Sequence, residues 1–199
     1  MKNGLFLLYN RRERSDYMHT WEDIQSFVVH CTRCPLCQTR NKAVMGYGNH
    51  EAKIMFIGEA PGAQEDLAGI PFVGPAGKLF DELLQDCGLS RKDVYVTNIV
   101  KCRPPYNRDP LEPEKECCFP YLRYETYLLH PKIIVCLGRV AAQKLIDPNF
   151  RITRQHGQWT ERKGYYLTAV YHPSALLRDP SKMEETKEDF KEIAKMVKR

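Results

Sequence analysis

Four short apolar runs recur along the chain, and segments with helical spacing lie between them. The runs cover residues 54–57, 94–100, 133–137 and 166–171. Continuous runs of this length, rich in β-branched residues, are typical of strands that are buried on both faces. The pattern therefore predicts four interior strands.

The segments between these runs carry apolar stripes with the period of an α-helix. Thr20 is a good N-cap for the first helix, and Pro120 is expected to kink the third. We predict helices over residues 20–31, 75–87, 113–129, 140–146 and 182–197. Strands that alternate with helices predict an α/β fold, a three-layer αβα sandwich around a four-stranded, mostly parallel sheet.

The length of 199 residues and the hydrophobic content of 43% suit one well-buried core. Residues 1–19 show no sustained period and hold several charges, so we predict a loosely ordered leader there and a single domain over residues 20–199. No stretch approaches the length of a membrane span, and we expect a soluble protein without a membrane partner.

The chain carries 30 Lys plus Arg against 25 Asp plus Glu, a formal net charge of +5. This mild excess permits a polyanionic partner without requiring one, and an ordinary solvated surface accounts for it equally well.

Cysteine is abundant for this length. No secretory signal accompanies these residues, because the apolar run over residues 5–9 is too short and is followed by arginines. We therefore expect a cytosolic protein, in which clustered cysteines bind metal or do redox work more often than they form disulfides. The eight are Cys31, Cys34, Cys37, Cys87, Cys102, Cys117, Cys118 and Cys136.

Polar side chains follow the ends of the predicted strands. Glu59 stands in the turn GEAPG (58–62), Asn98 lies near the end of the second run, Gly138 and Arg139 follow the third, and His172 follows the fourth. Each has an ordinary explanation by itself, as a turn cap, a partner for loop amides or a half-buried histidine. The carboxyl ends of parallel strands meet at one edge, where ligands bind in such sheets, so their shared position favours a site.

Five motifs in this order carry a resemblance to a known family. They are GEAPG, PFVGPAG, TNIVKCRPPYNRDP, a cysteine sixteen positions after Cys102, and HPSALLR. Together, over Cys31 to about Asp179, they resemble the family 4 uracil-DNA glycosylases, which carry an iron-sulfur cluster. The resemblance implies a DNA repair enzyme that flips uracil out of DNA and hydrolyses its glycosidic bond, leaving an abasic site.

The resemblance also implies one [4Fe-4S] cluster held by Cys31, Cys34, Cys102 and Cys118. A C-x-x-C turn with a distant pair suits such a cluster, whereas a zinc ribbon would use a second tight C-x-x-C. The four other cysteines are interpreted as a loop thiol, a thiol turned away from the cluster and two small core residues; they are, in that order, Cys37, Cys117, Cys87 and Cys136.

For the base, the resemblance implies that Phe72 stacks on the ring and that Glu65 crowds the C5 edge, where thymine has its methyl group. Asn98 offers one donor and one acceptor, complementary to O4 and N3–H of uracil. A core phenylalanine and a surface carboxylate remain alternatives for the first two. The other residues expected around the base are Gly58, Ala60 and Pro61.

For bond cleavage, the resemblance assigns to His172 a hydrogen bond to O2 of the leaving uracil. Glu59 is the candidate for an anion or general base near C1′. The family 1 enzymes have a water-activating Asp where this chain has Ala60, so it stays open whether Glu59 is the base or positions the substrate.

For DNA, we expect contacts with the phosphate backbone and one wedge residue. The loop after the second strand and the HPSALLR segment carry the candidates, with solvated loop residues and core leucines as the alternatives. The phosphate candidates are Lys101, Arg103, Arg108, Ser174 and Arg178, and the wedge candidates are Leu176 and Leu177.

Three hypotheses compete. The leading one is a monomeric, monofunctional glycosylase that acts on single- or double-stranded uracil-containing DNA and has replication or repair proteins as possible partners. The second is a non-catalytic or covalent-trapping iron-sulfur protein that binds uracil-DNA. The relatives that trap DNA carry a histidine-containing loop, but residues 103–112 contain no histidine. A small-molecule hydrolase is the third, disfavoured by the wedge-like loop and the cluster.

Overall fold

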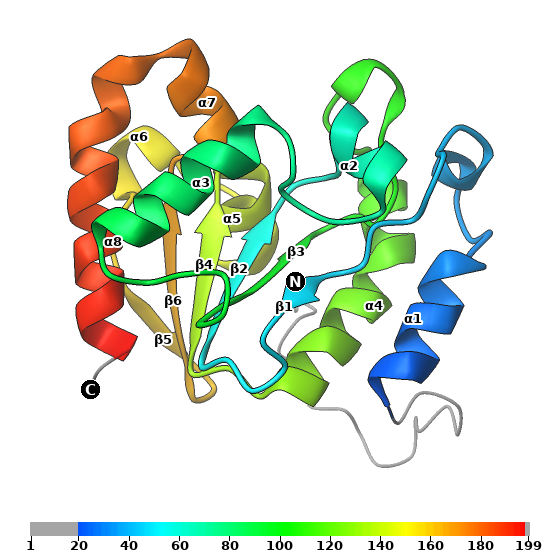
Figure 1. Cartoon of the computed structure of the whole chain (residues 1–199), viewed down its shortest axis with the longest axis horizontal. Helices are drawn as coiled ribbons and strands as arrows, with labels where there is room; N and C mark the ends of the chain where they lie inside the picture. Colours follow the sequence, from blue (N-terminus) through cyan, green and yellow to red (C-terminus); the bar gives the residue numbers. More distant parts are fainter. Residues whose placement is uncertain (1–19, 198–199) are drawn as a thin grey trace.

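The computed structural model describes residues 20–197, so the leader predicted for residues 1–19 lies outside the described residues. One six-stranded sheet runs through the centre of the described chain in the order β1-β3-β2-β4-β6-β5 (Figure 1). Its strands are β1 (Tyr47–Gly48), β2 (Ile54–Gly58), β3 (Tyr95–Asn98), β4 (Ile133–Leu137), β5 (Thr160–Arg162) and β6 (Tyr165–Val170).

The four central strands, β3, β2, β4 and β6, are mutually parallel and are the four that the apolar runs predicted. The edge strands β1 and β5 pair antiparallel with β3 and β6 and were not predicted. They have two and three residues, too few for an alternating pattern to show in the sequence. Such short edges also offer little unpaired backbone to another chain.

Helices cover both faces of the sheet. The α-helices are α1 (Trp21–Val29), α2 (Ala63–Ala68), α3 (Pro75–Asp86), α4 (Glu112–Leu129), α5 (Arg139–Leu145), α6 (Ile152–Gln155), α7 (Pro173–Arg178) and α8 (Met183–Val197), and the 3₁₀ turns are η3 (Pro35–Gln38), η4 (Pro105–Asn107) and η5 (Pro180–Lys182). The five predicted helices are all present, and Thr20 caps α1 as expected, with its hydroxyl accepting from the Asp23 N–H at 3.2 Å. Helix α4 is not interrupted at Pro120.

Strand β2 shows how the sequence builds two cores. Met55 and Ile57 face one side and pack with residues of α1, α4 and α5. Ile54 and Phe56 face the other side and pack with α3, α7 and α8. Because alternate side chains of a strand point to opposite faces, one continuous apolar run supplies both cores. The three-layer αβα sandwich is confirmed.

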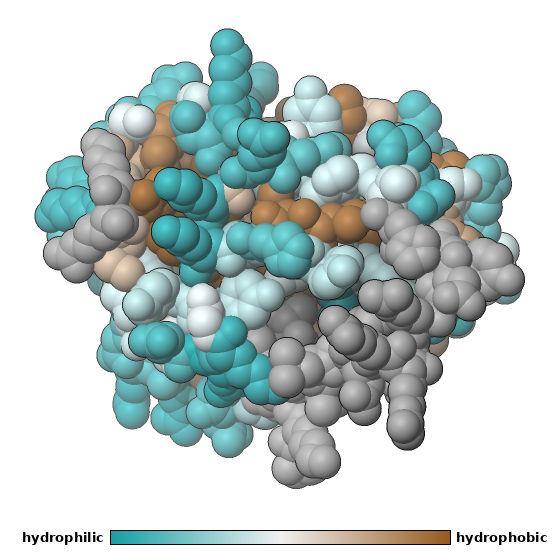
Figure 2. Space-filling model, turned by 90° about the horizontal axis from the view of Figure 1, so that it is seen from below, coloured by the Kyte–Doolittle hydropathy of each residue, from teal (hydrophilic) through white to brown (hydrophobic). Residues whose placement is uncertain are grey.

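The two ends of the sheet differ in character. Figure 2 shows the molecule from below, at the amino ends of the parallel strands, where hydrophilic residues cover most of the described surface around a short hydrophobic strip. Within residues 20–197, no helix combines the length and apolar character needed to cross a membrane. The residues that concern function lie at the opposite, carboxyl end of the strands.

Candidate active site

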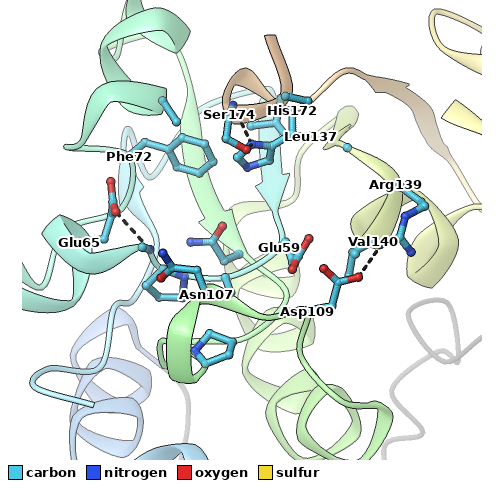
Figure 3. Close-up of a pocket in the computed structure, with 18 of the residues that line it drawn as sticks. Glu59, Glu65, Phe72, Asn107, Asp109, Leu137, Arg139, Val140, His172 and Ser174 are labelled. Atoms are coloured by element: carbon cyan, nitrogen blue, oxygen red, sulfur yellow. Dashed lines mark hydrogen bonds and ion pairs between the residues drawn. The ribbon is translucent and has the colours of Figure 1, made fainter. Parts of the chain in front are cut away.

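A cavity of about 460 Å³ opens at the carboxyl ends of the four parallel strands (Figure 3). Its lining confirms that the strand ends bring the predicted polar groups together. The predicted residues that line it are Glu59, Ala60, Pro61, Glu65, Phe72, Asn98, Arg108, His172, Ser174 and Arg178.

Asn98 ends β3 directly beside Gly58 of β2. Its side chain is buried, and its Oδ1 has no hydrogen-bond partner among the described residues. A Cβ atom at Gly58 would lie 2.4 Å from this oxygen and 2.8 Å from Cζ of Phe72. Glycine at 58 therefore lets the amide and the phenyl ring approach each other. A buried polar atom without a partner costs about 1–3 kcal/mol, so this oxygen is suited to a ligand that donates a hydrogen bond.

Phe72 is held in an unusual backbone conformation. Its φ is +55°, in the left-handed region that non-glycine residues rarely adopt. The Arg91 guanidinium donates to the Phe72 carbonyl at 2.7 Å, and Gly77 passes so close that a Cβ there would lie 1.9 Å from the same oxygen. These contacts fix the ring, which is buried and lies 5.8 Å from the His172 ring. The ring is thus both a core residue and a wall of the cavity.

Glu65 ties two loops together. Its carboxylate accepts the backbone N–H groups of Gly62, Val73 and Gly74 at 3.1, 2.9 and 2.8 Å. It thereby joins the turn after β2 to the segment that carries Phe72. From the sequence, Glu65 was expected either to crowd the C5 edge of the base or to be a surface carboxylate. Neither expectation included its hydrogen bonds to the two loops.

His172 stands at the N-cap of α7 with its ring toward the cavity (Figure 3). Its Nδ1 accepts the Ser174 backbone N–H at 3.1 Å and lies 2.8 Å from the Ser174 hydroxyl. A backbone amide can only donate, so Nδ1 carries no proton and Nε2 carries it. Burial, helped by the charge of Arg178, lowers the pKa of His172 to about 4. The ring is therefore a neutral donor at pH 7. Ser174, predicted as a phosphate contact, here orients this ring.

The opposite wall of the cavity is charged. Glu59, in the turn after β2, faces Asp109, in the loop after η4 (Figure 3). Asp109 forms a 2.5 Å ion pair with Arg139, the first residue of α5. Burial and the negative charge of Asp109 raise the pKa of Glu59 to about 7, while Arg139 opposes the rise. Asp109 was missed in the sequence, and Arg139 was signalled only by its place directly after a predicted strand end.

Lys101 was wrongly expected to meet DNA. Its side chain is 2% exposed, and its ammonium lies 2.5 Å from the Glu125 carboxylate, so a phosphate cannot reach it. The side chains of two neighbouring arginines are bound by residues close to them in the chain. Arg108 forms a two-pronged pair with the buried Glu114 at 2.6 and 2.8 Å, and Arg103 donates to Asn107 at 2.8 Å.

The two leucines of HPSALLR differ in exposure. Both lie on α7, where Leu176 is buried in the core and Leu177 is half exposed. Because a wedge residue must project from the surface, Leu177 is the only one of the pair that fits this role.

Six cysteines line a second hollow, near the end of α1, η3 and the start of α4. They are Cys31, Cys34, Cys37, Cys102, Cys117 and Cys118. Arg40 Nη1 lies 3.0 Å from Cys102 Sγ, and the Lys101 backbone N–H donates to Cys118 Sγ at 3.2 Å. Burial raises the pKa of the Cys102 and Cys118 thiols, and these N–H donors act in the opposite direction, toward the thiolate form that binds metal.

The hollow does not separate the four expected ligands from the other two cysteines. Cys117 lines it, so the expectation that this thiol turns away is wrong. Among the described residues, no group of three or more Cys, His, Asp or Glu side chains is arranged for a single metal ion. Cys136 is a buried core residue as predicted, and Cys87 packs half-buried against the core.

Comparison with known proteins finds a family and relatives that cover most of the chain. The Uracil DNA glycosylase superfamily matches residues 45–198. The Type-4 uracil-DNA glycosylase of Archaeoglobus fulgidus is 46% identical over 187 residues, covering 90% of this chain and 94% of that protein. That of Thermotoga maritima is 41% identical, covering 82% and 88%. The Type-5 uracil-DNA glycosylase of Thermus thermophilus is more distant, at 31% identity, covering 89% and 98%.

Proposed function

Because the chain belongs to the type-4 enzymes of the uracil-DNA glycosylase superfamily, we propose that the cavity at the strand ends is where it binds uracil and cuts the glycosidic bond. The protein is a uracil-DNA glycosylase, a hydrolase of N-glycosyl bonds that acts on uracil-containing DNA in repair. The roles of its residues below are our assignment.

One observation carries the assignment of the base site: the unpartnered amide oxygen of Asn98, buried beside the fixed ring of Phe72. Asn98 accepts N3–H of a flipped uracil with Oδ1 and donates to O4 with its NH₂ group. Phe72 stacks on the base. Cytosine presents the reversed donor and acceptor pattern on this edge, so it leaves both partners unsatisfied.

Residues around this pair complete the base site. Gly58 leaves room for the ring, and Ala60 and Pro61 line the turn next to it. Glu65 holds Phe72 in place through its three backbone hydrogen bonds and borders the cavity on the same side. We assign the exclusion of thymine's methyl group to this edge.

Bond cleavage uses the two opposite walls. The neutral His172 donates its Nε2 proton in a hydrogen bond to O2 of uracil as the base gains negative charge. A water molecule adds its oxygen to C1′, the C1′–N1 bond breaks with its electrons going to uracil, and the water proton passes to Glu59. This assigns Glu59 as general base, and hydrolysis leaves an abasic site with the DNA backbone intact.

We further propose one [4Fe-4S] cluster in the hollow of cysteines, held by Cys31, Cys34, Cys102 and Cys118. Six sulfurs facing one hollow, two of them receiving N–H donors, fit a group that needs four thiolates. When bound, the cluster cross-links the segment after α1 to the loop after β3. That loop leads to Arg108 and Asp109 on the cavity wall, so the cross-link steadies the active site.

For DNA, we propose that Leu177 enters the gap left by the flipped nucleotide and that Arg178, exposed at the end of α7, meets a phosphate. Arg103 and Arg108 shape the loop on the other side of the cavity and add positive charge there.

The direct test is incubation with single- and double-stranded oligonucleotides that contain one uracil, followed by alkali, which breaks the strand at an abasic site. Cleavage with wild-type protein and its loss in Asn98→Asp support the assignment. An Asn98→Asp variant as active as the wild type excludes Asn98 from base recognition. A protein–DNA adduct that survives heat in denaturant would instead favour covalent trapping.

A further inference from the structure

Three charged side chains from three separate segments meet on the wall opposite His172. Glu59 comes from the turn after β2, Asp109 from the loop after η4, and Arg139 from the start of α5. Of the three, only Glu59 has an assigned place in the reaction, as general base. Asp109 is turned into the cavity, faces Glu59 and is anchored by Arg139 at 2.5 Å (Figure 3).

We propose that Asp109 is a positioning residue for this reaction, which, anchored by Arg139, holds the Glu59 carboxyl toward C1′ and controls when that carboxyl is free to accept a proton. The proposal rests on the assignment of Glu59 as general base. It adds a second carboxylate to the active site, on a loop that the cysteine hollow adjoins.

Two carboxyl groups in contact repel each other when both are ionised, so they tend to share one proton. Asp109 is exposed and paired with Arg139, whereas Glu59 is more buried, so the shared proton is retained on Glu59. This agrees with the rise of the Glu59 pKa to about 7, caused first by burial and next by Asp109.

Other charged groups around Glu59 do not reproduce this effect. Arg139 and Lys115, from α5 and α4, both lower the pKa of Glu59. His172, across the cavity, is neutral at pH 7 because its own pKa is lowered to about 4. Asp109 is thus the one neighbouring charge in the described cavity that raises the proton affinity of Glu59.

As a consequence, Glu59 passes from its protonated to its ionised form near neutral pH, and the neighbouring charges set the pH at which this happens. Below its pKa, Glu59 holds a proton and cannot take one from the attacking water. Above it, the free carboxylate accepts that proton while the electrons of the C1′–N1 bond leave with uracil. The rate of excision therefore rises with pH, with a midpoint near 7.

The test is the single-turnover excision rate at saturating enzyme, measured from pH 5 to pH 9 for paired variants. In Asp109→Asn, the negative charge is lost, and the midpoint moves toward acid by about one pH unit. At pH 6, the variant then reaches a fraction of its own plateau rate that is about fivefold larger than the fraction that the wild type reaches. In Arg139→Gln, the balancing charge is lost and the midpoint moves toward alkali. The position of the midpoint is the readout, not the height of the plateau.

Asp86→Asn is the matched control. Asp86 also forms an ion pair, with Lys187 at 3.1 Å, but it lies at the end of α3 outside the cavity lining. It changes the net charge by the same amount as Asp109→Asn, so a midpoint equal to that of the wild type shows that a general effect on DNA binding does not shift the profile.

Glu59→Gln separates the two assignments. If this variant excises uracil at the wild-type rate across the range, the role of Glu59 as base is wrong. If it is inactive while Asp109→Asn and Arg139→Gln keep the wild-type midpoint, or both move in the same direction, Glu59 stands and the proposal for Asp109 is overturned. Opposite shifts in the two variants support it.

Discussion

The ion pair between Lys101 and Glu125 allows a sharp test of what holds the active-site strand in place. The ammonium lies 2.5 Å from the Glu125 carboxylate, and the two side chains are 2% and 0% exposed. Lys101 also donates to Thr97 Oγ1 at 2.5 Å and to the carbonyl of Asn98 at 3.0 Å. This buried network therefore also holds the backbone of Asn98, the residue to which we assign recognition of the base.

Replacing Lys101 by Met removes the positive charge and leaves the carboxylate of Glu125 buried without a counter-ion. Breaking a buried pair in this way costs about 3–5 kcal/mol. For a chain of this size, about 2–4 °C of melting temperature is lost per kcal/mol, so we expect Lys101→Met to lower Tm by roughly 6–20 °C. Differential scanning calorimetry under anaerobic conditions, at one scan rate and with iron content checked, measures this.

An exposed pair with almost the same geometry is the control. Lys191 lies 2.6 Å from Glu188 on α8, but both side chains are half exposed or more. Lys191→Met should leave Tm unchanged, because water screens such pairs. Adding Glu125→Gln to Lys101→Met removes the stranded charge and keeps an acceptor for the Gly46 N–H, so it should restore much of the loss. The reasoning is refuted if Lys101→Met melts with Lys191→Met, or if the double variant is no better than the single.

Three further predictions follow from the site. Asn98→Asp replaces the donor to O4 by a second acceptor, which costs about 1–3 kcal/mol and thus slows excision by roughly 5- to 150-fold in a single-turnover assay; an unchanged rate removes Asn98 from the site. Anaerobically purified protein should be brown, and colour that survives Cys102→Ala combined with Cys118→Ala contradicts their assignment as ligands. Leu177→Ala should weaken binding to duplex DNA, measured by fluorescence anisotropy, without lowering Tm, whereas Leu176→Ala should cost about 2–5 kcal/mol of stability; equal stability losses in both would contradict the wedge assignment.

The sequence was sufficient for the four central strands and for the gathering of polar residues at their carboxyl ends, because both depend on local pattern. An apolar run reveals a buried strand, and residues such as Asn98 and His172 follow strand ends that the fold brings to one edge. The edge strands β1 and β5 were missed because two or three residues carry no period. In these cases the limit is the length of the signal.

The sequence did not predict the position of side chains that are held by a partner far away in the chain. Lys101 stands in a basic, proline-rich loop and was expected on the surface, yet Glu125, 24 positions later on α4, draws it into the interior. Asp109 looks like a loop residue until Arg139, 30 positions later, orients it at the cavity. Nothing in the spacing of such pairs shows which two charges will meet, because the contact exists only after the helix packs on the sheet.

The division of the cavity into a neutral and a charged wall makes its pH dependence simple to interpret. The side to which we assign base binding holds His172, which gains a proton only near pH 4, together with Phe72 and Asn98, which do not titrate. The side to which we assign the sugar holds Glu59, whose pKa is raised to about 7. Between pH 5 and pH 9, base binding is thus unaffected by protonation of these residues, and a single rising limb reports the carboxyl of Glu59. A second, falling limb well below the pH at which uracil itself loses its N3 proton would require a titrating donor on the protein side and would contradict the neutral tautomer of His172, which its bond from the Ser174 N–H fixes.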